Sequence, residues 1–261
     1  MTEIPSPTLD IEDRQPRLKE ISSERRPETV LVIPDGNVRW ATSNGLSSFE
    51  GHIEGGRVMF GLLQVFVEIP ETKNLMAWGL SHENWKRPNQ EIKGVMKAIE
   101  QTIELAMPFF DKHKVRFARL GREDKIRGQF PSLWRTIQEA EKRTKDYDRK
   151  KFGLLLDFSG EDQQVRMAQK LTVLARQNPD LVVTPELWNS LRDGYELGFK
   201  PADLVIRTSG ELRTSGIGWP GDNAEFVSIK GLLPEISEED VVNALVEYSQ
   251  RDRRFGGRIQ I

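Results

Sequence analysis

The sequence predicts a single α/β domain with a central parallel six-stranded sheet flanked by helices, and two observations carry this prediction. Six short apolar runs alternate along the chain with longer stretches of helical period. The runs are apolar along their whole length rather than at every second position, which is typical of parallel strands that are covered on both faces.

The expected elements follow one another in regular alternation. The expected strands span residues 29–33, 75–80, 115–120, 152–158, 204–207 and 225–229. The expected helices span residues 52–67, 89–111, 124–145, 161–177 and 185–193, and a last one runs from the cap Ser237 to about Arg251. Residues 1–27 contain prolines and many charges but little apolar periodicity, so we expect a disordered leader there and a folded domain over residues 28–261.

The composition excludes several classes of function. The 261 residues include no cysteine, which excludes disulfides, thiolate catalysis and thiolate metal sites. A net charge of −2 gives no global basic field, so we expect no nucleic acid partner. The longest apolar stretch, residues 58–67, is too short to span a bilayer. Since the chain also opens without a signal pattern, we expect a cytoplasmic protein.

In a parallel sheet ligands bind beyond the carboxyl ends of the strands, so the segments there hold the candidate site. Asp35 follows the first strand, and Gly36 permits close approach of the backbone. Asn37 is expected to open a helix, whose first N–H groups attract anions, and Arg39 adds a cation suited to phosphate. A carboxylate beside an anion-binding segment suits a bridging Mg²⁺. The alternative is an ordinary Asp-Gly turn with a helix cap.

Three other segments contain candidate ligand-binding residues, and the support for binding differs between them. His52 and its neighbouring glycines start a helix, where ligand contact and close packing are equally good explanations. Residues 81–88 combine small polar, amide, aromatic and guanidinium groups, a composition that an ordinary loop could also have. Arg207 and Arg213 follow the fifth strand together with hydroxyl side chains, an arrangement that favours phosphate binding over a solvated loop.

Four motifs in this order resemble the signatures of the cis-prenyltransferase family, which includes undecaprenyl diphosphate synthase. They are Asp35-Gly36-Asn37-x-Arg39-Trp40-Ala41 with Gly51-His52, Ser81-x-Glu83-Asn84-Trp85-x-Arg87-Pro88, Arg207-Thr208-Ser209-Gly210-Glu211-x-Arg213-x-Ser215 with Ala224-Glu225-Phe226, and Arg251-x-Arg253-Arg254-Phe255-Gly256. The match covers about residues 28 to 257, and four motifs in order are far more specific than any one of them.

The resemblance implies a Mg²⁺-dependent transferase that joins an allylic diphosphate to isopentenyl diphosphate in the cis (Z) configuration. It also implies a homodimer, prenyl diphosphate substrates and a hydrophobic tunnel for the growing chain. Peripheral association with a membrane is expected only if the product is long.

The resemblance further implies roles for individual residues. Asp35 would hold Mg²⁺ on the allylic diphosphate, and Glu225 would assist the metal. The residues expected in catalysis are Asp35, Asn37, Ser81, Asn84 and Trp85. The residues expected to bind the diphosphates are Gly36, Asn37, Val38, Arg39, Trp40, His52, Arg87, Arg207, Arg213, Ser215, Arg254 and Gly256, of which Arg254 and Gly256 would reach into the partner's site.

The chain departs from the family pattern at several positions. Pro34 stands in place of the common methionine, Val38 replaces a glycine, and no arginine occurs near Ser48, where the family has one. The family's Asn-Tyr-Gly-Gly-Arg segment is Asp-Phe-Ser-Gly-Glu at residues 157–161. These changes resemble, in kind, those of the irregular branch that includes cyclolavandulyl diphosphate synthase and couples two dimethylallyl diphosphates.

Three hypotheses about function follow from the sequence. The first is a regular elongating enzyme with a short or specialised product. The second is irregular coupling or cyclisation of two dimethylallyl diphosphates, of lavandulyl type. The third is a non-catalytic partner subunit of a prenyltransferase complex, although a scaffold would have no need of Asp35, Arg39, Arg207 and Arg213.

Overall fold

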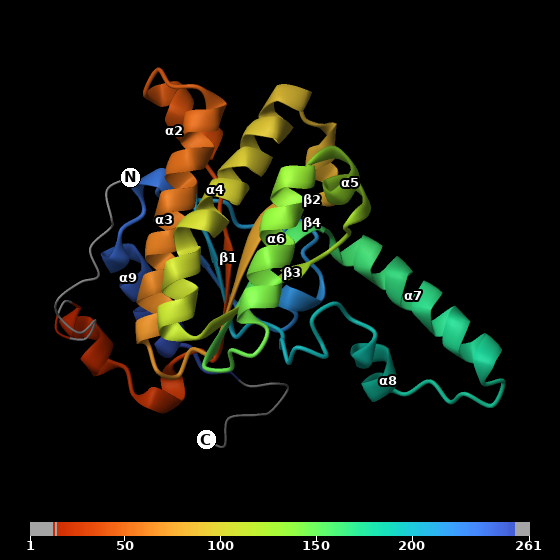
Figure 1. The fold of residues 1–261 in the computed structure, drawn as a ribbon. Coiled ribbons are helices and arrows are strands. Elements are labelled where there is room, and N and C mark those ends of the chain that lie inside the picture. Colours follow the sequence, from red (N-terminus) through yellow and green to blue (C-terminus); the bar gives the residue numbers. More distant parts are fainter. Residues whose placement is uncertain (1–12, 14, 254–261) are drawn as a thin grey trace.

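A six-stranded parallel sheet forms the centre of the molecule (Figure 1). The computed structural model describes residue 13 and residues 15–253 of the chain. The strands are β1 (Thr29–Ile33), β2 (Asn74–Ser81), β3 (Val115–Leu120), β4 (Lys150–Phe158), β5 (Leu204–Arg207) and β6 (Glu225–Ser228). They lie in the order β3-β4-β2-β1-β5-β6, and each neighbouring pair is parallel. The predicted fold class is confirmed.

The helices occur where the sequence predicts them, with one difference. They are α2 (Asn37–Ser43), α3 (Ser48–Glu68), α4 (Asn89–His113), α5 (Asp124–Gln129), α6 (Pro131–Thr144), α7 (Gly160–Gln177), α8 (Pro185–Ser190) and α9 (Glu238–Ser249). Short 3₁₀ segments lie at Pro16–Glu20, Ser23–Arg25, His82–Lys86, Trp219–Gly221 and Leu233–Glu235. The single helix expected over residues 124–145 is two helices, because Pro131 lacks a backbone N–H and begins a new helix instead of continuing α5.

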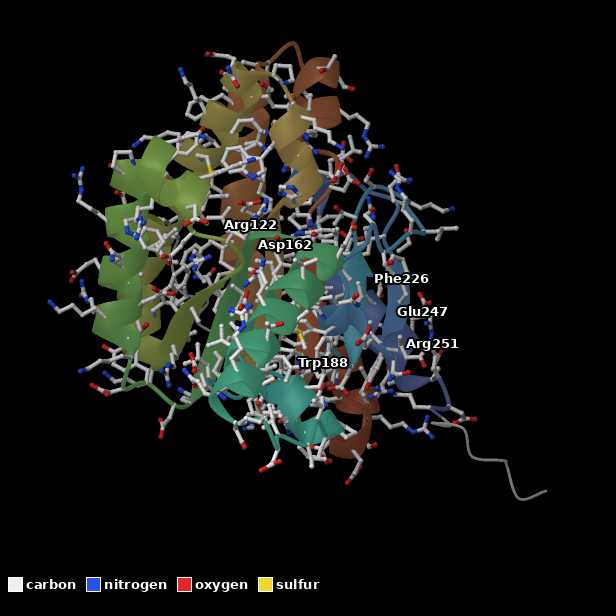
Figure 2. The ribbon with its side chains drawn as sticks, turned by 90° about the vertical axis from the view of Figure 1, so that its right-hand side faces the viewer. Arg122, Asp162, Trp188, Phe226, Glu247 and Arg251 are labelled. Atoms are coloured by element: carbon white, nitrogen blue, oxygen red, sulfur yellow. The ribbon has the colours of Figure 1, made fainter. Side chains whose placement is uncertain are left out.

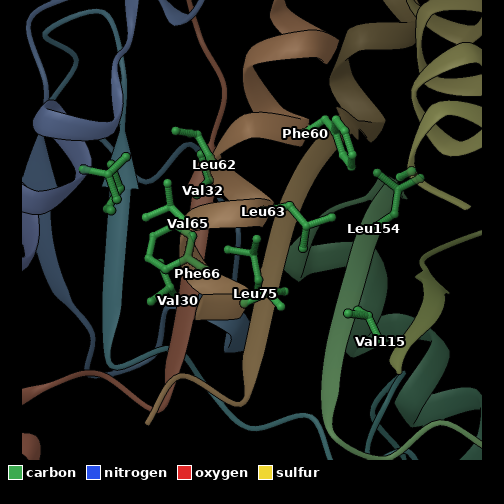
Figure 3. Packing of buried hydrophobic residues seen from close by; sticks show 14 of the residues in the cluster. Val30, Val32, Phe60, Leu62, Leu63, Val65, Phe66, Leu75, Val115 and Leu154 are labelled. Carbon is green, nitrogen blue, oxygen red and sulfur yellow. The ribbon is translucent and has the colours of Figure 1, made fainter. Parts of the chain in front are cut away.

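The two faces of the sheet are buried in separate hydrophobic clusters. Val30 and Val32 of β1 belong to the larger cluster, which α3, α4, α6 and α9 cover, whereas Leu31 and Ile33 belong to the smaller one. This alternation follows from the two-residue period of a strand. Figure 3 shows side chains of α3, among them Phe66, packed against the β1 valines in the larger cluster.

Residues 15–27, which lie within the leader expected from the sequence, pack against the folded domain. Leu18 and Ile21 are buried in the larger cluster, and the 3₁₀ segment around Leu18 packs against α9. Arg26 donates to the carbonyl oxygens of both residues. Two apolar residues spaced three apart were too weak a pattern to detect in the sequence. Residues 1–12 and 14 of the expected leader lie outside the described residues.

Helix α7 extends away from the sheet (Figure 1). Only Gly160, Gln163 and Met167 of its residues are buried. Within the described residues, no helix is both long enough and apolar enough to cross a membrane.

Candidate functional site

The carboxyl ends of β1 and β5 bring Asp35 and Arg207 together. Ile33 lies opposite Arg207 in the parallel register, so Asp35, two residues beyond β1, reaches the end of β5. Arg207 Nη2 donates to Asp35 Oδ2 at 2.8 Å, and Arg39 Nη2 donates to Asp35 Oδ1 at 3.0 Å. Asp35 and Arg207 are 172 residues apart in the chain, and strand pairing makes them neighbours.

The carboxylate of Asp35 is held in its ionised form. Burial by itself raises the pKa of a carboxyl group, and this is the largest single influence on Asp35. The hydrogen bonds and positive charges of Arg207 and then Arg39 together outweigh it, so the pKa of Asp35 lies below its ordinary value. The strand tip therefore carries a permanent negative charge between two cations.

Thr208, to which the sequence reasoning gave no role, fixes the backbone of Asp35. Its buried Oγ1 accepts a hydrogen bond from the Asp35 N–H and donates one to the Asp35 carbonyl, both at 2.7 Å. These bonds attach the segment after β1 to the end of β5. In the sequence, Thr208 follows Arg207 directly and belongs to the third motif, but neither feature indicates a contact with the Asp35 backbone.

Arg207 also organises the loop that follows β5. The Arg207 side chain is only 6% exposed, and its Nη1 donates to Ser215 Oγ at 2.7 Å and to the carbonyl of Arg213. The Arg213 side chain is 65% exposed and contacts the carboxylate of Glu211. The structure therefore brings together Arg207, Arg213 and Ser215, as the sequence predicts.

Asn37 and His52 form a polar pair beside Asp35. Asn37 Nδ2 lies 3.3 Å from His52 Nδ1, and if the amide donates, the ring carries its proton on Nε2. Burial, followed by the positive charge of Arg87, lowers the pKa of His52 to about 4, so the ring is neutral at neutral pH. Asn37 Oδ1 and His52 Nε2 are buried without a protein partner, which leaves one acceptor and one donor for a ligand or water.

The glycines at the start of α3 are explained first by packing. A Cβ atom at Gly55 would lie 2.2 Å from Asn37 Oδ1, and one at Gly51 would lie 2.3 Å from the Asn37 carbonyl oxygen. Gly36 has a φ of +103°, and a Cβ there would meet Leu232 at 2.8 Å. Val38 and Trp40 lie half-buried on α2, and neither lines the pocket described next.

An apolar pocket of about 750 Å³, including its part open to solvent, extends from this polar pair into the molecule. Pro34, Asn37, His52 and Leu233 line its polar end. Its walls come from α3, α4 and the sheet, and the lining includes Phe110, Phe117 and Phe152. The three rings are in contact, with centroids 5.9 to 6.1 Å apart.

The segment after β2 uses most of its predicted site residues for local structure. Ser81 and Asn84 cap the 3₁₀ segment His82–Lys86 reciprocally through side-chain to backbone hydrogen bonds of 3.0 and 3.2 Å. Arg87 pairs with Glu91 at 3.0 Å, although its charge also acts on His52. Trp85 packs between Phe130 and Lys125, and its Nε1 is buried without a partner. None of the predicted residues Ser81, Asn84, Trp85 and Arg87 lines the pocket.

Glu225 does not lie beside Asp35 within one chain, so its expected assistance to the metal stays a prediction. Glu225 lies opposite Leu204, at the amino end of β5, whereas Asp35 lies beyond the carboxyl end. From Leu204 to Arg207 the strand rises by three residues, about 10 Å, and Asp35 lies beyond Arg207, so Glu225 and Asp35 are farther apart than this. Glu225 accepts instead from Arg251 at 3.0 Å. Figure 2 shows Arg251 and Glu247 on the flank of the molecule, apart from Arg122. Arg254 and Gly256 lie outside the described residues.

A second charged cluster, at the ends of β2, β3 and β4, was not predicted as a site. Asp157 is completely buried, and its Oδ1 lies 3.2 Å from both His82 Nδ1 and Arg122 Nη2. Arg122 also pairs with Asp162 of α7 at 3.3 Å, next to which it lies in Figure 2. Asp157 stands where the family has asparagine, so the charge of Arg122 compensates for this departure.

Of the two expected metal ligands, Asp35 and Glu225, only Asp35 lies at the proposed site within one chain. In residue 13 and residues 15–253 there is no group of three or more histidine, aspartate or glutamate side chains that could hold a metal ion. Asp35 is ionised and 29% exposed. This donor set fits Mg²⁺, which commonly takes one or two protein carboxylates and completes its coordination with water and substrate phosphates.

Comparisons with known proteins show the family and the fold of the chain. The family described as "Putative undecaprenyl diphosphate synthase" matches residues 33–256. An isoprenyl transferase of Thermotoga maritima is 32% identical over 236 residues, which are 90% of this chain and 99% of the relative. Lavandulyl diphosphate synthase from Lavandula x intermedia, solved in complex with dimethylallyl diphosphate, has a TM-score of 0.83 and 27% identity, with 89% of this chain and 99% of that chain covered.

A probable undecaprenyl diphosphate synthase from Campylobacter jejuni has a TM-score of 0.69 at 24% identity, covers 88% of this chain and 98% of its own, and supports the fold alone. The fold and these relatives define an enzyme of isoprenoid biosynthesis that transfers prenyl groups. The chain belongs to the undecaprenyl diphosphate synthase family, that is, to the cis-prenyltransferases.

Proposed function

We propose that this enzyme condenses an allylic diphosphate with isopentenyl diphosphate in the cis configuration and releases a short or specialised product. One observation carries the proposal. An ionised carboxylate between two arginines, Asp35 with Arg39 and Arg207, stands directly beside the polar end of a deep apolar pocket. A molecule with a diphosphate head and a hydrocarbon tail matches both parts of this arrangement.

Each half of the polar site suits one diphosphate. Asn37 and His52 line the pocket. With Arg39, which lies on the same helix as Asn37, they would hold the allylic diphosphate, whose tail enters the pocket. Arg207, Arg213 and Ser215 would hold the isopentenyl diphosphate beside it. Arginine pairs with phosphate oxygens bidentately, and fixed cations at the leaving group favour a transition state in which negative charge develops there.

Mg²⁺ would be held by Asp35 and would supply further positive charge to the departing diphosphate. The low pKa of Asp35 keeps a carboxylate available for this role at neutral pH. The apolar lining of the pocket would keep water from the reactive allylic fragment.

The extent of the pocket supports a short product. Its volume of about 750 Å³ includes space that is open to solvent, so the enclosed part of the pocket is smaller than this value. The contacting rings of Phe110, Phe117 and Phe152 fill the space between α4, β3 and β4. We expect these three side chains to stop chain growth, so that the predicted tunnel is closed at this point.

A homodimer is supported by apolar residues that have no cover in one chain. Val165 and Val173 of α7 are 52% and 53% exposed, and Val182 and Val183, which follow, are 74% and 54% exposed. A helix that extends from its own domain and presents valines to solvent is typical of a subunit interface. A second copy of this chain would also be the source from which Glu225, Arg254 and Gly256 could reach a site.

The test is a product analysis. The purified enzyme is incubated with Mg²⁺ and dimethylallyl, geranyl or farnesyl diphosphate, each with and without isopentenyl diphosphate, and products are identified by mass spectrometry. Products that need isopentenyl diphosphate and differ by five carbons are expected. If the protein turns over none of these substrate pairs, the proposed enzymatic function is wrong, and a non-catalytic partner subunit is favoured instead.

Irregular coupling of two dimethylallyl diphosphates is the second candidate, supported by the likeness to lavandulyl diphosphate synthase. Ser47, close to the position where the family has an arginine, instead caps α3 in a reciprocal pair with Glu50. A ten-carbon product formed from dimethylallyl diphosphate alone would establish this reaction and overturn regular elongation.

A further inference from the structure

Glu211 connects the arginines of the two proposed diphosphate subsites. Its Oε1 lies 3.9 Å from Arg39 Nη1, and its Oε2 accepts from Arg213 Nη1. Arg39 also donates to Asp35, which accepts from Arg207, and Arg207 donates to the carbonyl of Arg213. These five residues form a closed circle of contacts, which we call the ion ring.

The two carboxylates of the ion ring do different things. Asp35 pairs with Arg207, whose side chain is 6% exposed and is fixed by further bonds to the loop. Glu211 pairs with Arg39 and Arg213, whose side chains are 52% and 65% exposed. Glu211 therefore contacts both guanidinium groups that have room to turn toward a ligand, and it shares Arg39 with Asp35, to which Arg39 donates at 3.0 Å.

A diphosphate and Glu211 need the same partners. Guanidinium groups pair with carboxylate and with phosphate in the same bidentate geometry. Like charges at this range repel each other, and partial burial of Glu211 reduces solvent screening of the repulsion. A diphosphate on Arg39 or Arg213 would therefore displace the Glu211 carboxylate.

We propose that Glu211 is the internal counter-ion of Arg39 and Arg213, that it sets the affinity for diphosphate, and that it couples the two subsites. This inference rests on the proposed function, since it assumes that both arginines bind diphosphates. A diphosphate that repels Glu211 from one arginine also moves the carboxylate away from the other, so the first diphosphate facilitates binding of the second. Such coupling acts equally in both directions.

Isothermal titration of the full chain with inorganic pyrophosphate tests the proposal. We expect Glu211→Gln to bind pyrophosphate about tenfold more tightly, because one repulsive charge near the surface is removed. Glu211→Asp keeps the charge and should bind close to wild type. Asp146→Asn removes one exposed negative charge after α6, remote from the ion ring, and should leave the affinity unchanged.

Steady-state kinetics give a second readout. Tighter binding of both substrates and of the pyrophosphate product should lower KM and also lower kcat in Glu211→Gln, provided that product release limits turnover. Equal melting temperatures of wild type and variant exclude a folding effect.

Each outcome decides something. Unchanged or weaker pyrophosphate binding by Glu211→Gln, while wild type binds measurably, would overturn the counter-ion role and leave the proposed function standing. If neither wild type nor the variant binds pyrophosphate, the diphosphate site itself fails and the inference fails with it.

Discussion

Asp35 owes its charge to residues that are remote in the sequence. Its position after a buried strand predicts a ligand-facing side chain, but the low pKa depends on Arg207, which strand pairing brings to 2.8 Å. The same pairing lets Thr208 clamp the Asp35 backbone. At the residue scale, the site is therefore one carboxylate whose ionisation and orientation come from β5.

Replacement of this carboxylate should abolish most activity. We expect Asp35→Asn to lower kcat by about 10²–10³-fold, because an ionised group that acts on developing charge is lost. The measurement is product formation at saturating Mg²⁺, with Asp146→Asn as the charge-matched control. Activity within about threefold of wild type would remove the metal role assigned to Asp35.

His52 predicts a dependence of stability on pH. Its folded-state pKa of about 4 lies below the ordinary value of 6.5, so between these values the unfolded chain binds more protons than the folded one. Stability is therefore fully present above pH 6.5 and is lost as pH falls toward 4. Between pH 7 and pH 5 the expected loss from His52 is about 2 kcal/mol.

Urea denaturation at pH 7 and pH 5 measures this loss directly. His52→Gln keeps a polar side chain without a titrating ring, so it should lose less stability over the same interval. An equal loss in both proteins would show that other groups cause the pH dependence.

At the scale of elements, α3 combines two kinds of glycine. A Cβ at Gly55 would lie 2.2 Å from Asn37 Oδ1, whereas a Cβ at Gly61 would meet nothing within 4 Å. We expect Gly55→Ala to displace Asn37 and weaken diphosphate binding. Gly61→Ala, on the same helix, should stabilise the fold by about 0.5–1 kcal/mol through helix propensity. Pyrophosphate titration measures the affinity of both variants, and thermal melting measures their stability. Equal affinity and equal stability of the two variants would contradict the close contact between position 55 and Asn37.

The aromatic trio between α4, β3 and β4 should govern product length. Phe152→Ala removes one ring from the contact with Phe110 and Phe117, which deepens the pocket, so longer products are expected. Phe199→Ala removes an equal volume on the opposite face of the sheet and serves as control. Identical product lengths for wild type and Phe152→Ala in mass spectrometry would place the end of the pocket elsewhere.

At the scale of the whole molecule, the expected site residues that the structure describes do not all meet within one chain. Glu225 lies at the far end of the sheet, paired with Arg251. Neither of the exposed valines of α7, Val165 and Val173, lines the pocket. Association through α7 would therefore leave the pocket accessible, and this makes a dimer compatible with catalysis in both subunits.

The proposed dimer is tested by a charge on α7. Val173→Asp buries a carboxylate in the expected interface, so we expect a shift toward monomer at low protein concentration, measured by size-exclusion chromatography with light scattering. Gln138→Asp adds the same charge on the exposed side of α6 and should leave the mass unchanged. A monomeric wild type, or an unaffected Val173→Asp dimer, would contradict the assignment of this surface.

Much of the fold and part of the site could be predicted from local sequence. Continuous apolar runs identify all six strands to within about two residues, because burial on both faces dictates their composition. The rule that ligands bind at carboxyl ends then selects Asp35 and Arg207 correctly as neighbours. Pro131 shows the limit of periodicity, since the helical pattern continued across a break that the missing N–H imposes.

The sequence by itself determined the fold class, the family and the segments that form the site, since these follow from local composition and motif order. Tertiary structure decided which residues meet. It separated Glu225 from Asp35, buried Leu18 and Ile21 in the core, and gave Ser81 and Asn84 a capping role. It also closed the ion ring through Glu211. The physical reason is that distance, burial and charge pairing depend on strand order and helix packing, which join residues that no local pattern connects.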